Sequence, residues 1–364
     1  MRNIFFLLLG LFLFVSCQET GSENTFTKPK NIILMIGDGM GTSQLYSAYV
    51  ANKGFFNAER CKYIGFSKTY SADNLVTDSG AGGTALACGQ KTNNKRIGMT
   101  ADSIPIKSIL HYAEMNNKAT GMVATAAITH ATPASFIAHE PMRYNYEEIA
   151  ADFLDTDIDV FIGGGLKHFN KRKDNRNLVD SLKANGYEIA LNMDEVEAFN
   201  GNKLAGLIYE EHPPYFSKGR GDMLRQSSIK AIETLAKNKN GFFLMIEGSQ
   251  IDWAGHDKDS EILVQEVQDF DNTIGAVLDF AEKNGETLVI IIADHETGGY
   301  VITDGDIEKG EVVGEFVTSN HTAVMVPILA FGPQAENFIG FMENIDIFTK
   351  MYKAFGFDPK ALTK

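Results

Sequence analysis

The stretch Leu288-Val-Ile-Ile-Ile292, followed by Ala293-Asp294-His295-Glu296, indicates the fold class of this chain. Two other stretches share its design: residues 31–36 run into Gly37-Asp38-Gly39, and residues 242–246 run into Glu247. Short continuous apolar runs are typical of parallel strands that are covered on both faces. In open α/β sheets the working site lies beyond the carboxyl ends of such strands. The three stretches therefore predict polar side chains that meet at one edge of a parallel sheet.

Strand and helix signals alternate along most of the chain. Helical patterns are clearest at residues 106–116, 223–236 and 261–283, and a strand at 159–162 ends in Gly163-Gly-Gly165, a turn signal. No linker, internal repeat or low-complexity run follows residue 30. We therefore predict a single doubly wound α/β domain over residues 30–364, with a central, mostly parallel sheet flanked by helices on both faces.

A serine stands at the start of a predicted helix. Residues 76–85 read Val-Thr-Asp-Ser-Gly-Ala-Gly-Gly-Thr-Ala, so that tiny residues follow Ser79 directly. The N-terminus of a helix offers free backbone N–H groups and the positive end of the helix dipole, which favour an anion. Small residues also let a substrate approach the backbone closely. Taken alone, the motif fits equally well a serine that caps a helix after a Gly-rich turn.

Acidic and histidine side chains gather at the predicted sheet edge. They follow the three strands directly or lie just beyond them: Asp38, Glu247, Asp252, His256, Asp294 and His295. Each alone has an ordinary interpretation as a turn, a helix cap or a surface pair. Together they would repel one another unless cations are bound. Carboxylates with imidazoles suit zinc, and an all-oxygen subset suits magnesium.

With these residues in place, the sequence resembles the alkaline phosphatases from about residue 30 to the C-terminus. The motifs that carry the resemblance are, in order, the Asp38 loop, Thr77-Asp78-Ser79, His130-Ala-Thr132-Pro133, Arg143, Glu247 to His256, Asp294-His295 and His321-Thr322. The resemblance implies an enzyme that hydrolyses small-molecule phosphate monoesters. It also implies two zinc ions and one magnesium ion.

The resemblance assigns a role to each motif residue. The first zinc would be held by Asp252, His256 and His321, the second by Asp38, Asp294, His295 and Ser79, and the magnesium by Asp38, Thr132 and Glu247. Ser79 would be the nucleophile and would form a phosphoserine intermediate. Arg143 would clamp the phosphate through its planar fork.

Two positions depart from some bacterial members of this family. His130 stands where they carry an acidic residue, and Trp253 stands where they carry a lysine. We expect both side chains to face the substrate, with the indole of Trp253 at the rim of the first zinc site. A neutral imidazole at position 130 should weaken the binding of magnesium, so the identity of the third metal stays open.

Other functions remain as alternatives. A phosphodiesterase or nucleotide pyrophosphatase of the same superfamily would keep both zinc sites but typically lacks the third site and Arg143. A sulfatase would carry Cys or Ser followed by x-Pro-x-Arg, whereas Ser79 is followed by Gly-Ala-Gly-Gly. A non-catalytic lipoprotein that stores zinc or captures phosphate belongs to a different class. A non-catalytic function would give no reason for Ser79 and Arg143 to be present together with a full set of metal ligands.

The net charge of −14 speaks against nucleic-acid binding, which needs a basic face.

At the N-terminus, Arg2 precedes an apolar run over residues 4–15 that is too short to span a bilayer and is typical of a signal peptide. The run ends in Phe14-Val-Ser-Cys17, which resembles a lipobox. We expect residues 1–17 to be a signal peptide and lipobox and residues 18–29 a flexible tether. The protein would then be exported from a bacterial cell, to the periplasm or to the outer membrane through a lipid on Cys17. An ordinary secretory signal is the alternative.

Three further points concern the cysteines, the loops and the oligomer. Cys61 and Cys88 could pair in an oxidising compartment, although Cys88 fits better as a packing residue on the helix behind Ser79. Only about twenty residues separate Tyr300 from His321, so the insertions of larger relatives should be short or absent here. The sequence leaves a homodimer open.

Overall fold

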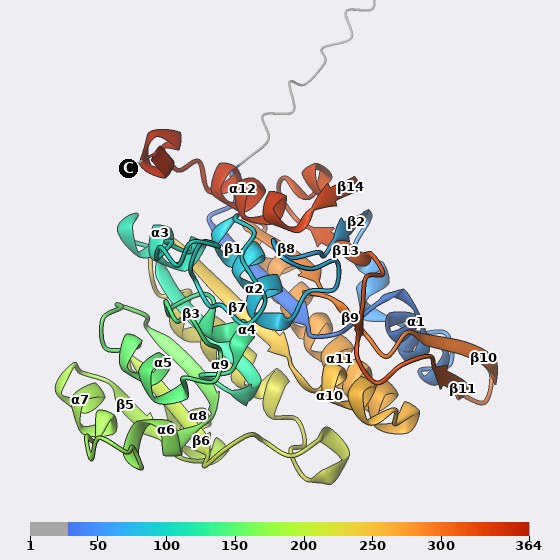
Figure 1. Ribbon diagram of the computed structural model, residues 1–364, viewed down its shortest axis with the longest axis horizontal. Coiled ribbons are helices and arrows are strands. Elements are labelled where there is room, and N and C mark those ends of the chain that lie inside the picture. The colour runs from blue at the N-terminus through green and yellow to red at the C-terminus, as the bar shows by residue number, and fades with distance from the viewer. Residues whose placement is uncertain (1–27, 364) are drawn as a thin grey trace, which may run out of the picture.

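The structure is a computed structural model that describes residues 28–363. The predicted signal peptide and lipobox, with Cys17, and all of the predicted tether except Lys28 and Pro29 lie outside these residues. Within the part that is described, no helix combines the length and the apolar character that crossing a bilayer requires. The chain folds around one central sheet, as Figure 1 shows.

Ten strands form this sheet in the order β14-β2-β13-β8-β1-β7-β3-β4-β6-β5. All neighbours pair in parallel except β13, which is antiparallel to both β2 and β8. The prediction of a mostly parallel sheet is therefore confirmed. The strands are β1 (Asn31–Gly37), β2 (Tyr63–Lys68), β3 (Ala119–Ala127), β4 (Val160–Gly164), β5 (Glu188–Ala190), β6 (Leu204–Tyr209), β7 (Phe242–Gly248), β8 (Thr287–Ile292), β13 (Val326–Phe331) and β14 (Gly340–Glu343).

The three apolar stretches that decide the fold are neighbours at the centre of the sheet. Strand β1 lies between β7 and β8, and every residue of the three strands is buried. The register places Ile36 beside both Glu247 and Ile292, so the carboxyl ends of the strands are level. Burial of these runs on both faces supplies much of the hydrophobic stabilisation and fixes the register of the residues that follow them.

Helices cover both faces of the sheet, as predicted (Figure 1). Helices α1, α9, α10 and α11 pack together on one side, and α2, α3 and α12 pack on the other. The helices are α1 (Thr42–Ala51), α2 (Ser79–Cys88), α3 (Ile109–Met115), α4 (Ala131–Ala134), α5 (Tyr146–Asp152), α6 (Leu166–Asn170), α7 (Leu178–Ala184), α8 (Met193–Ala198), α9 (Met223–Leu235), α10 (Gln250–Asp257), α11 (Ser260–Asn284) and α12 (Asn344–Phe355).

The predicted helices at 223–236 and 261–283 match α9 and α11 to within one residue at each end. The helix predicted at 106–116 begins later, at Ile109. Ser108 is its N-cap: the Ser108 hydroxyl accepts a bond from the backbone N–H of His111, and the His111 ring accepts one from the N–H of Ser108. This reciprocal cap satisfies two free backbone donors and fixes the start of the helix.

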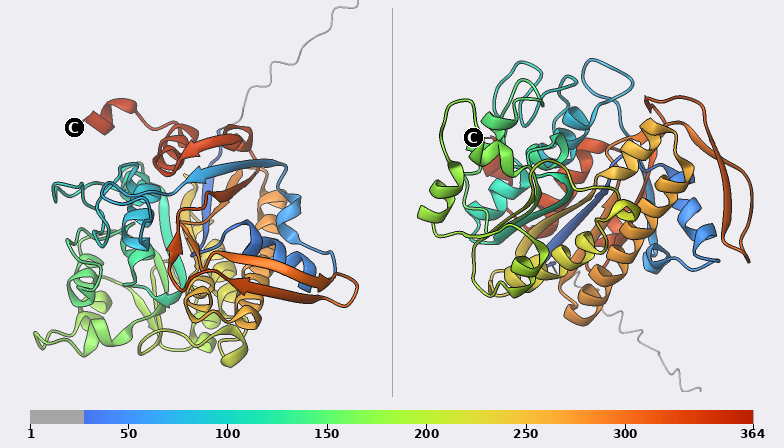
Figure 2. Two further views of the ribbon diagram at one scale, coloured as in Figure 1. Left: turned by 45° about the vertical axis from the view of Figure 1, so that its right-hand side comes forward. Right: turned by 90° about the horizontal axis from the view of Figure 1, so that it is seen from below.

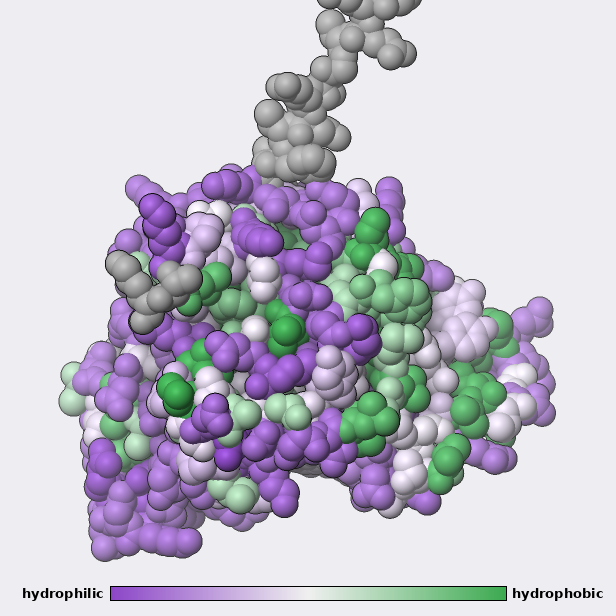
Figure 3. Space-filling model, turned by 45° about the horizontal axis from the view of Figure 1, so that its top comes forward, coloured by the Kyte–Doolittle hydropathy of each residue, from purple (hydrophilic) through white to green (hydrophobic). Residues whose placement is uncertain are grey.

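The segment between Tyr300 and His321 is a hairpin of strands β10 (Tyr300–Asp306) and β11 (Glu311–Phe316), which projects from the body of the molecule (Figure 2). Two short strands, β9 (Glu296–Thr297) and β12 (His321–Thr322), pair beneath it. The expectation of short connections here therefore agrees with the structure. On the face shown in Figure 3, apolar side chains lie in separate clusters between hydrophilic ones.

Both described cysteines are free, so they do not pair with each other. Burial raises the pKa of the Cys61 thiol to about 12 and raises that of Cys88 further. The Cys88 sulfur lies 3.8 Å from the carbonyl oxygens of Ile106 and Ser135, inside the core behind α2. Cys88 is a packing residue, and the disulfide that the sequence left open is absent from the described residues.

Candidate metal centre

The first of three groups of ligand side chains lies around the start of α2. One ligand atom from each of Asp38, Asp294 and His295 lies within 4.8 Å of the others. The His295 Nε2 atom is 3.4 Å from Asp38 Oδ1, 3.2 Å from Asp294 Oδ2 and 3.2 Å from the hydroxyl of Ser79. All four side chains are buried. The residues that the resemblance assigns to the second zinc therefore converge on one point.

Ser79 owes its place to the helix that it begins. It is the first residue of α2, and Asp78 is the N-cap, whose carboxylate accepts a 3.0 Å bond from the N–H of Ala81. A Cβ on Gly82 would stand 3.0 Å from the carbonyl oxygen of Asp294, so the small residue lets the helix start approach the Asp294 loop. The Gly-rich run thus brings the serine against the ligand group.

The second group comprises Asp252, His256 and His321. The Nδ1 atoms of the two histidines donate to backbone carbonyls, His256 to Ser319 at 2.7 Å and His321 to Thr77 at 2.8 Å. In the neutral rings, the Nε2 atoms therefore carry lone pairs. The two Nε2 atoms lie 3.1 Å apart. Asp252 Oδ1 is 3.3 Å from the Nε2 atom of His256 and 3.4 Å from that of His321. Such an arrangement needs a proton or a cation between the rings. In the absence of a cation, the bond to Asp252 raises the pKa of His256 to about 9.

The third group joins Asp38 to Glu247, at the end of β7, and to His130, just before the short helix α4. The hydroxyl of Thr132 donates to Asp38 Oδ2 at 3.3 Å. A ring nitrogen of His130 is thus a candidate ligand in its own right, in addition to Thr132, which the resemblance assigns to the magnesium. The third group mixes nitrogen with oxygen donors.

The donors in these groups fit cations. Buried atoms without a hydrogen-bond partner among the described residues include Asp38 Oδ1, both oxygens of Glu247, Asp294 Oδ2 and His130 Nδ1. Burial, together with the neighbouring acidic charges, raises the pKa of Glu247 to about 7 and that of Asp294 to about 6, and raises that of Asp38 well above its usual value. Leaving such atoms unpaired is costly, and divalent cations would satisfy them.

Arg143 lies beside the serine helix and is buried. Its Nη1 donates to Asp78 Oδ2 at 3.0 Å, and its Nη2 lies 3.4 Å from His130 Nε2. Burial would lower the pKa of Arg143, but the charges of Asp78 and Asp38 outweigh it and raise that pKa. The guanidinium is therefore held charged and oriented next to Ser79 and the third group.

Trp253 is half-buried on α10, between Asp252 and His256 in sequence. Its ring packs edge-on against His212, with ring centroids 4.7 Å apart, and against His130 at 5.9 Å. Its aromatic contacts thus lie on the side of the third group. His212 is not among the site residues predicted from the sequence, although it follows β6 at the same sheet edge, where the rule of strand ends applies to it as well.

Two residues beside the candidate metal ligands were also not predicted from the sequence. The hydroxyl of Thr297 bonds Asp252 Oδ1 and lies 3.3 Å from His295 Nδ1, so it links two ligand groups. The buried carboxylate of Glu296 accepts bonds from Gln44 at 2.6 Å and from Thr322. Glu296 and Thr297 directly follow His295, in a segment that alone fits an ordinary loop. The partner of Thr297 lies in α10, and those of Glu296 lie in α1 and β12. Such long-range partners leave no local pattern.

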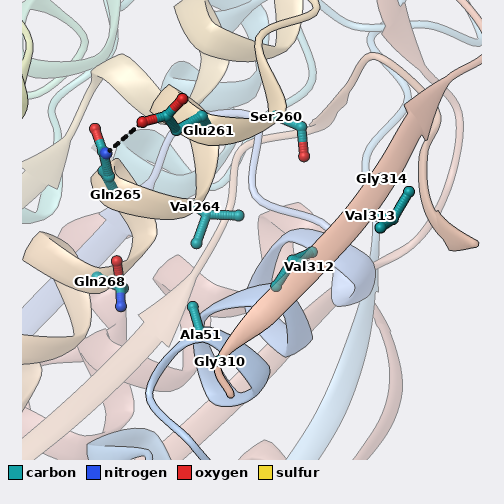
Figure 4. Close-up of a pocket in the computed structure, with 10 residues that line it drawn as sticks. All are labelled: Ala51, Ser260, Glu261, Val264, Gln265, Gln268, Gly310, Val312, Val313 and Gly314. Carbon is teal, nitrogen blue, oxygen red and sulfur yellow. Dashed lines mark hydrogen bonds between the residues drawn. The ribbon is translucent and has the colours of Figure 1, made fainter. Parts of the chain in front are cut away.

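A groove of about 560 Å³ lies elsewhere, between α1, α11 and β11 (Figure 4). Its lining includes Ser260, Glu261 and Val312, and the Gln265 amide donates to Glu261 at 3.4 Å. No residue of the three ligand groups lines it. The groove is therefore separate from the candidate metal centre.

A mostly parallel sheet flanked by helices, whose carboxyl edge gathers three candidate cation-binding groups around a serine and an arginine, is the arrangement expected of a metal-dependent phosphoester hydrolase. A family model described as alkaline phosphatase matches residues 29–316 of this chain. The chain belongs to the alkaline phosphatase family and is an enzyme of the phosphoric monoester hydrolase class.

The similar proteins span nearly the whole chain. "Alkaline phosphatase 3" of Bacillus subtilis is 34% identical, in an alignment that covers 95% of this chain and 93% of that protein. The alkaline phosphatase of Escherichia coli is 30% identical, over 90% of this chain and 86% of its own. The solved structure of the alkaline phosphatase from the Antarctic bacterium TAB5 is 42% identical, with a TM-score of 0.87, over 91% of this chain and all of that one. Variants of the TAB5 enzyme with Asp or Glu in place of a histidine are described with Mg bound in its M3 site.

Proposed function

We propose that this protein is a zinc-dependent alkaline phosphatase that hydrolyses phosphate monoesters through a phosphoserine at Ser79 and releases inorganic phosphate. The observation that carries the proposal is the position of the Ser79 hydroxyl, 3.2 Å from His295 Nε2, with Asp38 and Asp294 against the same nitrogen. A serine in this position is both a candidate ligand and a candidate nucleophile.

In this proposal, Asp38, Asp294 and His295 hold one zinc ion with Ser79, and Asp252, His256 and His321 hold the other. Bound zinc would lower the pKa of the serine hydroxyl and stabilise charge on the attacking and leaving oxygens.

The chain's own side chains orient the reactants. The Ser79 oxygen forms the new bond to phosphorus while the bond to the ester oxygen breaks, and water then cleaves the phosphoserine and regenerates the hydroxyl. Arg143, fixed by Asp78, can offer its fork to the phosphate oxygens that do not react. Ser79 and the side chains around it are buried, which limits the access of bulk water.

The third group would take a divalent cation between Asp38, Glu247, His130 and Thr132. A neutral imidazole suits magnesium less well than a carboxylate, so we propose that magnesium binds weakly here. The TAB5 variants with an acidic residue in place of a histidine and with Mg in the M3 site support this.

Export and lipid attachment are further proposals, which rest on residues 1–17 alone. Metabolic labelling with a radioactive fatty acid tests them. We expect labelled protein in the membrane fraction, and no label after Cys17→Ala. Unlabelled wild-type protein in the culture fluid or periplasm would point to an ordinary secretory signal.

The substrate comparison tests the proposed activity. We expect a phosphate monoester to be hydrolysed far faster than its diester and sulfate analogues, because the fork of Arg143 can bond phosphate oxygens that do not react. The diester has one such oxygen fewer, and the sulfate ester carries less negative charge. Preference for the diester would favour a phosphodiesterase. No turnover of any ester by the zinc-loaded protein would favour the non-catalytic alternative.

A further inference from the structure

The loop from Glu210 to Asp222, which joins β6 to α9, is fastened to the elements around the candidate metal centre. The Gln250 side chain donates to the carbonyl oxygen of Pro213 at 2.7 Å, and the Tyr215 hydroxyl donates to Asp257 at 2.8 Å. Both partners belong to α10, the helix that carries two ligands of the second group. The loop therefore keeps a fixed position relative to α10.

A buried ion pair holds the far end of the same loop. The Arg220 guanidinium bonds Glu266 at 2.6 Å and Asp269 at 2.8 Å, and it also donates to Gln250 at 2.9 Å. The side chains of all three charged residues are at most 2% exposed. Removing one partner of such a pair is strongly unfavourable, so this end of the loop is also fixed.

His212 lies in the first part of this loop and connects it to the third group. Its Nδ1 accepts a 3.0 Å bond from the backbone N–H of Ala127, the last residue of β3. The carbonyl oxygen of Ala127 in turn accepts the N–H of His130 at 2.8 Å. One residue of β3 thus ties the His212 ring to the backbone of His130.

Three rings meet at this point, each nearly perpendicular to the other two. The ring centroids are 4.7 Å apart for His212 and Trp253, 5.7 Å for His212 and His130, and 5.9 Å for His130 and Trp253. The interplanar angles are 87°, 87° and 84°. Edge-to-face packing is directional, so each ring restricts the rotation of the others.

We propose that His212 is a positioning residue for the third cation group. Its ring, fixed by Ala127, holds His130 and Trp253 in the orientation in which an imidazole nitrogen of His130 faces Asp38 and Glu247. His212 thereby sets how tightly that group binds a divalent cation, without contacting the cation itself. The inference rests on one part of the proposed function, the uptake of a cation by the third group.

Three substitutions separate the parts of this arrangement. His212→Ala removes both the ring and the acceptor for the Ala127 N–H. His212→Phe keeps a ring but loses the acceptor, whereas His212→Asn keeps an acceptor and loses the ring. His111→Ala is the matched control, because His111 also combines a hydrogen bond with a ring contact, to His139, and belongs to none of the three groups.

Each zinc-loaded variant is titrated with magnesium, and bound metal per chain is measured by mass spectrometry. The emission of Trp253, the only tryptophan, is recorded with and without metals. We expect His212→Ala to raise the magnesium concentration needed for half-occupancy roughly three- to tenfold, with zinc content unchanged. We also expect it to shift the emission of the metal-free protein. The magnesium concentration for half-occupancy in His212→Phe and His212→Asn should lie between the values for wild type and His212→Ala. His111→Ala should have the wild-type value.

Unchanged magnesium affinity in His212→Ala would overturn the inference, as would an equal loss of all cations in His212→Ala and His111→Ala. Wild-type protein that hydrolyses monoesters but takes up no third cation would overturn it too, and would leave the proposed activity standing. Wild-type protein that hydrolyses no monoester would refute the proposed function, while metal content and Trp253 emission would still decide the role of His212.

Discussion

Removing the guanidinium of Arg143 should weaken the binding of phosphate. The guanidinium is buried and held by a 3.0 Å bond to Asp78, and its Nε has no hydrogen-bond partner among the described residues. It is therefore oriented before phosphate arrives. A hydrogen bond to a charged group contributes about 1.5–3 kcal/mol. Since about 1.4 kcal/mol is a tenfold change, Arg143→Ala should raise the inhibition constant of inorganic phosphate about 10- to 150-fold.

The assay is competitive inhibition of monoester hydrolysis by inorganic phosphate, with kcat/KM measured on a monoester and its diester. We expect kcat/KM for the monoester to fall by a similar factor. The value of kcat/KM for the diester should fall less, because the diester has one free phosphate oxygen fewer. Arg143→Lys keeps the charge but loses the fork, so its inhibition constant should lie between those of wild type and Arg143→Ala.

Arg172→Ala is the matched control, because Arg172 is another buried arginine paired with a carboxylate, at 2.6 Å from Asp174, and lies outside the three groups. It should lower thermal stability and leave the inhibition constant of phosphate unchanged. If Arg143→Ala left that constant at its wild-type value while retaining its zinc, the role of Arg143 as a phosphate clamp would be refuted.

Three further predictions concern the metals and the single tryptophan. Chelation should abolish activity, and added zinc should restore most of it; recovery with magnesium alone would contradict the ligand assignment. His130→Asp should lower the activating concentration of magnesium by about tenfold, since a charged donor replaces a neutral one, and an unchanged magnesium titration would rule this out. Removal of zinc, and separately saturation with phosphate, should each shift or quench the emission of Trp253. An unaltered spectrum in a protein whose activity responds to both treatments would place Trp253 away from the site.

The part of the fold that could be predicted is the part that local pattern determines. The apolar runs that became β1, β7 and β8 lie side by side, as expected for buried parallel strands, and the candidate ligands beyond them converge at the carboxyl edge. The start of α3 was placed too early because its cap depends on the side-chain geometry of Ser108 and His111. Composition alone does not distinguish a capped start from one a turn earlier.

The part of the site that could not be predicted depends on contacts between distant segments. His212 reaches Ala127 and Trp253 across the sheet edge, and Thr297 reaches Asp252 on another element. The position of His212 after β6 marks it as a candidate, but the partners of His212 and Thr297 do not follow from any sequence spacing. Likewise, the contacts of Trp253 with His130 and His212 place its ring beside the third group, and these contacts could not be derived from its position between Asp252 and His256. Side-chain direction on a short helix was the missing information.

The proposed mechanism requires that Ser79 carries the phosphoryl group during turnover. The zinc-loaded enzyme is mixed with excess monoester, quenched in acid within the first turnovers, digested, and analysed by peptide mass spectrometry. We predict phosphate on Ser79 and on no other residue, and the same label in Ser135→Ala, which alters a buried serine near the same helix. Ser79→Ala should show no label, should retain its zinc and should have less than about 1% of wild-type activity. Phosphate on a different side chain, or near wild-type turnover by Ser79→Ala, would contradict the assignment of Ser79 as the nucleophile.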